Sequence, residues 1–293
     1  MLVLRGHRTG TTVTAVAFAP DGASLASASS DDTFRLWDLG GQGTRILGHE
    51  PYPTCVAFAP DGSELACAHR GGVRLWRPPS AQRSIPFTRV GAWQVRYSPD
   101  GRFLAAGWPE LTVWDRVHPA MRSLHAQVPG RVCGVAFAPD GRTLAAGYSI
   151  EHQGAAWEHG VRLLDPVTGR EQGRLTGPGD SAGSLAYRPG SRLLAAACGQ
   201  YLWVWDVAGG RPVFQHKIGN LHFQEVAFTP DGRYLAAARN DSTVYFWDAD
   251  TWREAAAFDW EIGALVCLAI APDGMRAAAG SKKGKIVVWD VDL

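Results

Sequence analysis

Short apolar runs, each ended by the same turn, recur along the whole chain. In the first copy the apolar and small residues of Val16-Ala17-Phe18 lead into Ala19-Pro20-Asp21-Gly22. Proline presets φ, aspartate bonds to its own backbone and glycine supplies a positive φ, so this segment predicts a turn. A small-residue run at 25–29 and a β-forming run at 34–37 follow, with Thr44–Leu47 as a fourth element. The copy therefore predicts four strands.

Seven such copies can be aligned on their prolines, which are Pro20, Pro60, Pro99, Pro139, Pro189, Pro230 and Pro272. Successive prolines are 40, 39, 40, 50, 41 and 42 positions apart. A period near forty is typical of four-stranded propeller blades. The pattern therefore predicts an all-β fold, a seven-bladed β-propeller in which each blade is a four-stranded antiparallel sheet. We expect residues 1–293 to form a single domain.

The two ends of the chain complement each other. The last copy ends at 286–290 and leaves three further residues, so it lacks a fourth strand. Residues 1–5 are strand-like but too short for a blade. We expect them to complete the last blade and close the ring, because closure removes open sheet edges.

Composition argues against several classes of binding partner and cofactor. The formal net charge of the 293 residues is +1, which argues against a nucleic-acid or acidic-membrane partner. There is no transmembrane run, and Met1-Leu2-Val3-Leu4 is too short for the apolar part of a secretory signal. The five cysteines lie on predicted strands without metal-ligand spacing; they are Cys55, Cys67, Cys133, Cys198 and Cys267. We expect buried free thiols, a cytoplasmic location and no cofactor or metal.

The motifs resemble those of the WD-repeat β-propellers over essentially the whole chain. The resemblance rests on Gly6-His7 and Gly48-His49, on the seven turns and on Trp-Asp pairs that end the third strands. These pairs are Trp37-Asp38, Trp114-Asp115, Trp205-Asp206, Trp247-Asp248 and Trp289-Asp290. We expect a bacterial member of the family.

The resemblance also implies a hydrogen-bonded set of four residues within a blade. Only the first copy carries all four, as His7, Ser27, Asp31 and Trp37. Elsewhere the aspartate position holds other residues in most copies, and Leu164 replaces the tryptophan of the fourth. We therefore expect apolar packing to hold the other blades, with small second strands inside and the tryptophans as core anchors.

Family topology places two sets of loops on one face, here called the top rim: the loops joining second to third strands, and the residues preceding each first strand. The fourth copy is eight residues longer there, since Phe137 to Leu164 spans 27 positions against 19 from Phe18 to Trp37. The extra residues lie within 148–159, which we expect to be a loop. It is either one wall of a partner-binding site or an idle insertion. Its histidines and glutamates lack a recognised metal spacing.

Aromatic and arginine side chains dominate interface energetics, and several occur at rim positions. The candidate partner-binding residues are Tyr52, His69, Arg70, Trp93, Trp108, Arg131, Glu151, His152, Trp157, Glu158, His159, His222, Gln224 and Asn240. We expect Tyr52, Trp93, Trp108 and Arg131 to contribute most. Trp108 has an alternative role, which is to fill the space left by the missing aspartate.

No catalytic constellation emerges. Gly179-Asp180-Ser181-Ala182-Gly183 matches the G-x-S-x-G pattern of a nucleophile elbow, but that motif requires a following helix. Here a predicted inner strand follows, so a glycine-rich turn is the better interpretation. We predict that the protein is not an enzyme.

Three hypotheses about function remain. The first is a non-catalytic scaffold, a monomeric propeller that binds a protein or peptide on the top rim and central opening. The second is an enzyme or small-ligand binder that uses the axial funnel, against which the mostly apolar inner strands argue. The third is a sensory or regulatory propeller of a larger signalling protein. Fold alone does not choose among them.

Overall fold

A computed structural model describes residues 1–41, 43–77, 85–88, 91–117, 123–126, 128–152, 156–177 and 179–293. Residues 153–155 of the insertion lie outside this set. The chain divides into two compact units: unit 1 comprises Met1–Trp93 and Ala227–Leu293, and unit 2 comprises Gln94–Val226. The single-domain organisation stays a prediction.

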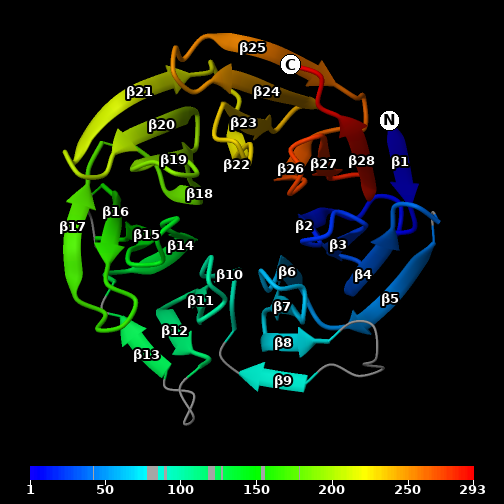
Figure 1. Cartoon of the computed structure of the whole chain (residues 1–293), viewed down its shortest axis with the longest axis horizontal. Helices are drawn as coiled ribbons and strands as arrows, with labels where there is room; N and C mark the ends of the chain where they lie inside the picture. Colours follow the sequence, from blue (N-terminus) through cyan, green and yellow to red (C-terminus); the bar gives the residue numbers. More distant parts are fainter. Residues whose placement is uncertain are drawn as a thin grey trace. The chain divides into compact units, whose positions relative to one another are not determined.

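Four blades include strands of unit 1, and Figure 1 labels them. Their strands, in sheet order, are β2 (Val13–Phe18), β3 (Ser24–Ser29), β4 (Thr33–Asp38) and β5 (Thr44–His49); β6 (Pro53–Phe58), β7 (Leu65–His69), β8 (Gly72–Trp76) and β9 (Ile85–Thr88); β22 (Phe223–Phe228), β23 (Tyr234–Arg239), β24 (Thr243–Asp248) and β25 (Glu254–Asp259); β26 (Leu265–Ile270), β27 (Arg276–Ser281), β28 (Lys285–Asp290) and β1 (Leu2–Arg5). The unit boundary passes through β22.

Three blades belong to unit 2. Their strands are β10 (Gln94–Tyr97), β11 (Phe103–Gly107), β12 (Leu111–Asp115) and β13 (Ser123–Ala126); β14 (Arg131–Phe137), β15 (Leu144–Ile150), β16 (Glu158–Leu164) and β17 (Glu171–Leu175); β18 (Ala182–Tyr187), β19 (Leu193–Cys198), β20 (Tyr201–Asp206) and β21 (Arg211–Lys217). All sheets are antiparallel, and the described residues contain no helix. The predicted seven-bladed β-propeller is confirmed.

The first strand of the chain completes the last blade, as expected. β1 pairs antiparallel with β28, with Leu2 opposite Val288 and Arg5 opposite Lys285. Leu4 packs into the same core cluster as Ile286. An otherwise open edge of β28 is thereby paired within its own sheet.

The recurring turn behaves as the sequence predicts. Gly22 has φ of 68° and donates its N–H to the Ala19 carbonyl at 2.8 Å, while Asp21 Oδ1 accepts the N–H of Ala23 at 2.9 Å. The fifth copy, Pro189-Gly190-Ser191, forms its turn with a different backbone conformation. Its positive φ, 62°, is at Gly190, directly after the proline, which is the pattern of a type II turn.

Side chains are small on the second strands of the blades and large on the third strands, as predicted. Alanines of the second strands have no exposed surface, for example Ala26, Ala145 and Ala236, whereas Trp37 and Trp205 are large, buried side chains of third strands. The tryptophans at the third-strand position are therefore core anchors. Glycine appears where even alanine is too large: a Cβ on Gly280 would lie 2.6 Å from Val13 Cγ1 of the neighbouring first strand.

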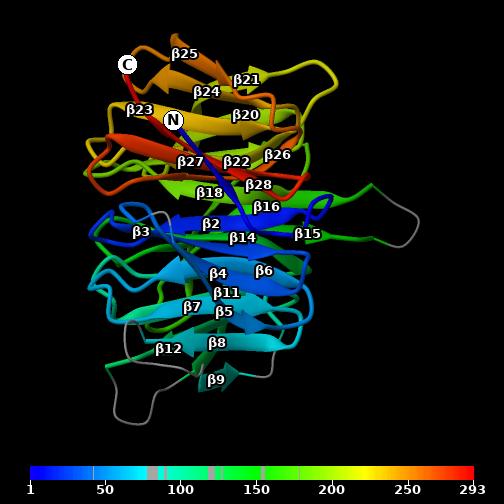
Figure 2. The same ribbon diagram turned by 90° about the vertical axis from the view of Figure 1, so that its right-hand side faces the viewer.

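The insertion in the fourth blade is not entirely a loop, which corrects our expectation. Residues 148–150 and 158–160 extend β15 and β16, with Ile150 opposite Glu158. Figure 2 shows the two strands continuing as a hairpin past the other strands of unit 2. The alternation of Tyr148-Ser149-Ile150 was a strand signal that the insertion length concealed.

Four of the five cysteines are buried free thiols, as expected. Cys133 is the exception, because it is partly exposed. It lies directly beside the register shift of the β14–β15 pair, between Val132 and Gly134. The extra residue of such a bulge is left unpaired and its side chain points in a different direction, which explains the partial exposure of Cys133.

Candidate functional site

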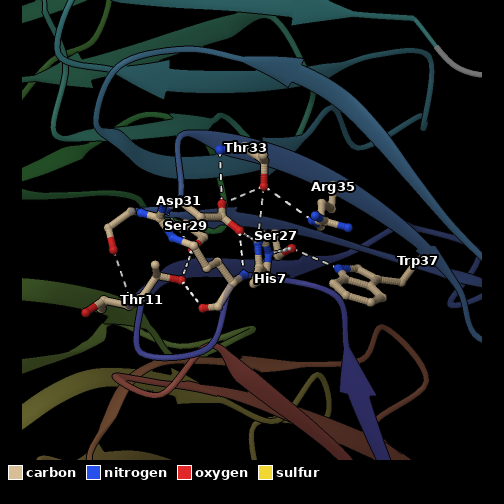
Figure 3. Close-up of polar contacts among 11 residues, drawn as sticks. His7, Thr11, Ser27, Ser29, Asp31, Thr33, Arg35 and Trp37 are labelled. Carbon is tan, nitrogen blue, oxygen red and sulfur yellow. Dashed lines mark hydrogen bonds and ion pairs between the residues drawn. The ribbon is translucent and has the colours of Figure 1, made fainter.

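The first blade contains a hydrogen-bonded chain that links two of its strands, β3 and β4, and the turn between them to the segment after β1. His7 Nδ1 lies 2.9 Å from Asp31 Oδ2, and His7 Nε2 lies 2.7 Å from Ser27 Oγ. Trp37 Nε1 donates to the same Ser27 oxygen at 2.8 Å. Figure 3 shows the four side chains in one row, with Thr33 beside Asp31. The structure thus brings together the four residues that the resemblance implied.

The donor and acceptor capacities of these four side chains determine which atom carries the proton in each hydrogen bond. The Trp37 indole can only donate and an ionised Asp31 can only accept, so Ser27 donates to His7 Nε2 and His7 donates from Nδ1. Burial lowers the pKa of His7, although Asp31 opposes the shift. Burial would raise the pKa of Asp31, but hydrogen bonds from Thr33, the Arg8 amide and His7 lower it to about 2. Neutral His7 beside ionised Asp31 is therefore the stable pairing.

The second blade lacks a corresponding hydrogen-bonded set of side chains, although Gly48-His49 precedes it in the sequence. His49 is exposed, and Cys67 takes the position of Ser27 in the register opposite the third strand. Trp76 Nε1 is buried without a hydrogen-bond partner among the described residues. The last blade is similar, since Trp289 Nε1 also lacks a described partner. Apolar packing therefore holds these tryptophans.

Buried His69, by contrast, belongs to a charged cluster in the second blade. Its Nε2 is 3.8 Å from Glu50 Oε2, and Arg74 forms an ion pair with the same glutamate. Burial lowers the pKa of His69, and the charge of Glu50 opposes that shift. His69 is thus an interior polar group rather than an exposed rim side chain.

The rim of unit 1 exposes two aromatic side chains. Tyr52 is 62% exposed, has a positive φ of 55° and lies under the Arg70 guanidinium, whose Cζ is 5.5 Å from the ring centroid. Trp93 is 55% exposed. Asn240 is half-buried, on the turn where Arg239 and Asp241 pair through Nε and Oδ2 at 2.7 Å.

The rim of unit 2 gathers a second cluster around Arg131. Its Cζ lies 5.5 Å from the ring centroid of Trp108 and 5.9 Å from that of Trp157. Trp157 is 44% exposed and is stacked on His159, with ring planes 3° apart. Glu151 Oε2 is 4.0 Å from an Arg131 nitrogen. Arg131 belongs to β14, Trp108 follows β11, and the others belong to the β15–β16 hairpin.

The other face of the hairpin carries a separate polar set. The Tyr148 hydroxyl donates to Glu158 Oε1 at 3.1 Å, and His152 Nε2 lies 3.3 Å from Glu158 Oε2. Hydrogen bonds from His152 and Tyr148 lower the pKa of Glu158. A Cβ on Gly160 would meet the Tyr148 ring at 2.8–2.9 Å, so glycine makes room for this tyrosine. The carboxylate of Glu158 is already engaged.

Inner strands are more polar than their sequences suggested. Arg96 of β10 and Glu225 of β22 form an ion pair at 3.2 Å. Gln94 donates to the Gly183 carbonyl at 2.7 Å and accepts the N–H of Val135 at 3.1 Å. Each of these three polar side chains therefore already has a partner within unit 2. His222 is exposed and Gln224 is half-buried near the start of β22.

The described residues hold no group of three or more His, Cys, Asp or Glu side chains that could bind a metal. The G-x-S-x-G segment leads directly into β18, and Asp180 Oδ1 accepts the Ser181 N–H at 2.7 Å. It is a turn before a strand and lacks the strand-to-helix context of a nucleophile elbow. In the described part of the chain no helix has the length and apolar character to cross a membrane.

Comparison with protein families gives one match. The family described as "WD domain, G-beta repeat" matches residues 1–38, 41–77, 220–248 and 262–290. These matches support the WD-repeat family. The WD-repeat segments include the first blade with its complete His7–Trp37 chain. The residues between 78 and 219 fall outside the four matched segments.

The relatives that this chain resembles are distant. A "WD repeat-containing protein 26 homolog" of Arabidopsis thaliana is 22% identical over 94% of this chain and 48% of its own length. "Target of rapamycin complex subunit LST8" of Bos taurus is 22% identical over 47% of this chain and 43% of its own. "Serine-threonine kinase receptor-associated protein" of Rattus norvegicus is 22% identical over 67% and 53%. The chain thus covers about half of these relatives. All three are eukaryotic, so they lend no support to a bacterial origin.

Proposed function

We propose that this chain is a non-catalytic scaffold that binds a protein or peptide on its top rim. The observation that carries the proposal is the pair of arginine–aromatic clusters at rim positions, one in each unit. Tyr52, Trp93 and Trp157 expose 62%, 55% and 44% of their surface there. Large aromatic side chains beside arginine are the composition of interface hot spots, and loops on a rigid sheet framework are where binding concentrates.

The names of two relatives support the same class of function. One is a subunit of a complex and the other is receptor-associated, so both names refer to association with other molecules. By analogy we propose protein partners for this chain. The absence of nucleic-acid and membrane partners, the monomeric state and the cytoplasmic location stay predictions, as does a place within a larger signalling protein.

An axial ligand is the second hypothesis, and the Arg96–Glu225 pair bears on it. A ligand in the funnel would have to replace a formed ion pair and compete with the engaged Gln94 amide. Breaking such a partly buried pair leaves one charge without a partner, which is unfavourable. We therefore favour the rim over the funnel.

Affinity capture tests the proposal when each captured protein is afterwards purified and titrated. A Trp93→Ala/Trp108→Ala double variant should weaken binding of a genuine partner by at least tenfold, as expected when interface aromatic residues are truncated. A Val117→Ala/Val167→Ala double variant is the control, because these valines are 73% and 58% exposed and follow third strands, away from the rim. Equal affinity of the rim variant and the control variant for every partner would refute the rim assignment.

A further inference from the structure

The Arg131 guanidinium contacts two indole rings. Its carbon is 5.5 Å from the Trp108 centroid and 5.9 Å from the Trp157 centroid, so both rings lie within cation–π distance. Such contact limits the motion of a long side chain and leaves the N–H edges available. Arg131 nevertheless keeps 53% of its side-chain surface exposed.

Within the part of the chain that the structure describes, the N–H donors of this guanidinium have no hydrogen-bond acceptor. Among the described residues its one carboxylate neighbour is Glu151, with 4.0 Å between the charged atoms and 63% of the Glu151 side chain exposed. That distance is beyond hydrogen-bond range, and exposed pairs of this kind contribute little. A planar fork of N–H donors, held in place and unsatisfied, matches the geometry of a carboxylate.

The surroundings that order Arg131 are themselves constrained. Trp108 has φ of 110°, a region that bulky residues rarely adopt. Strained backbone of this kind persists where the surrounding structure enforces it and occurs often at ligand clamps. Trp157 is held by its stack on His159, with 6.3 Å between the ring centroids. The two rings are therefore positioned before any partner arrives.

Local charge narrows the class of ligand. Glu110 follows Trp108 closely, and Glu151, Glu158 and Asp180 lie on the neighbouring rim segments, so these carboxylates outnumber the two nearby arginines, Arg131 and Arg162. This excess of negative charge disfavours a doubly charged phosphate or a run of acidic residues. It favours one carboxylate accompanied by basic side chains, which can face Glu151 after it is displaced.

We infer that Arg131, in cation–π contact with Trp108 and Trp157, is the anchor for a single aspartate or glutamate of an otherwise neutral-to-basic partner peptide. The carboxylate accepts hydrogen bonds from the guanidinium fork and displaces Glu151. The apolar part of the peptide packs on the exposed Trp157 ring. This inference deepens the proposed scaffold function and rests on it.

Fluorescently labelled peptides test the anchor with the full chain. They share one frame of leucine and lysine residues and differ at a central position, which is glutamate, glutamine or phosphoserine. The wild type should bind the glutamate peptide about tenfold more tightly than the glutamine peptide, the difference expected for one charge-assisted, bidentate contact. Arg131→Gln should abolish that preference, and Arg131→Lys should lose most of it because an ammonium lacks the fork.

Arg233→Gln is the matched control, since Arg233 is also an exposed arginine over an aromatic ring, 5.0 Å from the Tyr234 centroid, but it precedes a second strand, away from the rim. It should keep the preference for glutamate. The inference is overturned if the wild type binds no peptide or fails to distinguish glutamate from glutamine. Tighter binding of phosphoserine overturns the carboxylate assignment, and an unchanged Arg131→Gln variant overturns the anchor. A partner captured through the rim, but without any glutamate preference, removes the anchor and leaves the scaffold function standing.

Discussion

His7 donates a hydrogen bond of 2.9 Å from Nδ1 to Asp31 Oδ2, across 24 positions of the chain. Asp31 also accepts the N–H of Arg8 at 2.9 Å and the N–H of Thr33 at 3.1 Å. One carboxylate thus ties the segment after β1 to the turn between β3 and β4. Since β1 completes the sheet of the last blade, this contact connects the closing strand to the first blade within unit 1.

We expect this pair to make folding stability depend on pH in two windows. The pKa of His7 is lowered on folding, so the unfolded chain binds a proton more readily and stability should fall as pH drops below about 6.5. The pKa of Asp31 is lowered to about 2, so its contribution is complete above the unfolded value and is lost as pH falls from about 4 to about 2. Urea denaturation across pH 5 to 8 measures the first window.

Two histidine variants separate the contribution of His7 from general effects of acid. His7→Gln should make the decline of stability between neutral pH and pH 5 shallower, and buried His69, whose pKa is also lowered, contributes to the decline that remains. His49→Gln, at the exposed histidine of the other Gly-His pair, should leave the decline unchanged. If both variants retain the wild-type slope, His7 is not the titrating group.

Ser27 and Cys67 occupy equivalent, fully buried positions, and their truncation should have unequal consequences. Ser27→Ala removes the partner of both His7 Nε2 and Trp37 Nε1 and should lower the free energy of unfolding by about 3 kcal/mol. Cys67→Ala leaves no new unsatisfied polar group, because Trp76 Nε1 already lacks a described partner, and should lower it by about 1 kcal/mol. Thermal and urea denaturation compare the two, and equal losses would contradict the role assigned to Ser27.

Much of the fold follows from local chemistry. Asp21 and Gly22 determine their turn within a few residues, and the alternation of a small second strand with a tryptophan-bearing third strand repeats in most copies. Such features depend on neighbours in sequence, and a fixed period repeats them. The pairing of residues 1–5 with the last blade was also predictable, because the last copy lacked one strand.

The side-chain clusters depend on the register in which strands pair, and the forty-residue period of the sequence does not determine that register. Arg131 and Trp157 meet because β15 and β16 continue their pairing to Ile150 and Glu158, and the insertion hid that extension. Arg96 and Glu225 are 129 positions apart, so nothing local pairs them. His49 shows the converse, since its motif matches that of His7 while the side chain is exposed. Motif identity alone therefore did not determine which side chains meet.

Close approach of two strands in unit 2 predicts the effect of a single methyl group. A Cβ on Gly147 would overlap the carbonyl oxygen of Ala182, the first residue of β18, and backbone cannot move aside as a flexible side chain can. Gly147→Ala should therefore destabilise the protein by about 2–3 kcal/mol, typical of overpacking. Gly183→Ala is the control, because nothing lies within 4 Å of its added Cβ. Denaturation curves in which both variants match the wild type would show that the strands separate easily.

Removal of residues 1–5 tests how much the last blade depends on its fourth strand. The deletion unpairs β28 and removes buried Leu4 from the cluster that includes Val13 and Ile286. Loss of one buried leucine alone should cost about 2–5 kcal/mol, and the exposed strand edge should promote self-association. A Leu4→Ala variant retains the backbone pairing and separates the two effects: it should be destabilised but remain monomeric at concentrations where the deletion associates. Sedimentation velocity measures association and urea denaturation measures stability. A deletion variant as stable and as monodisperse as the intact chain would mean that β1 pairs with β28 without stabilising the blade.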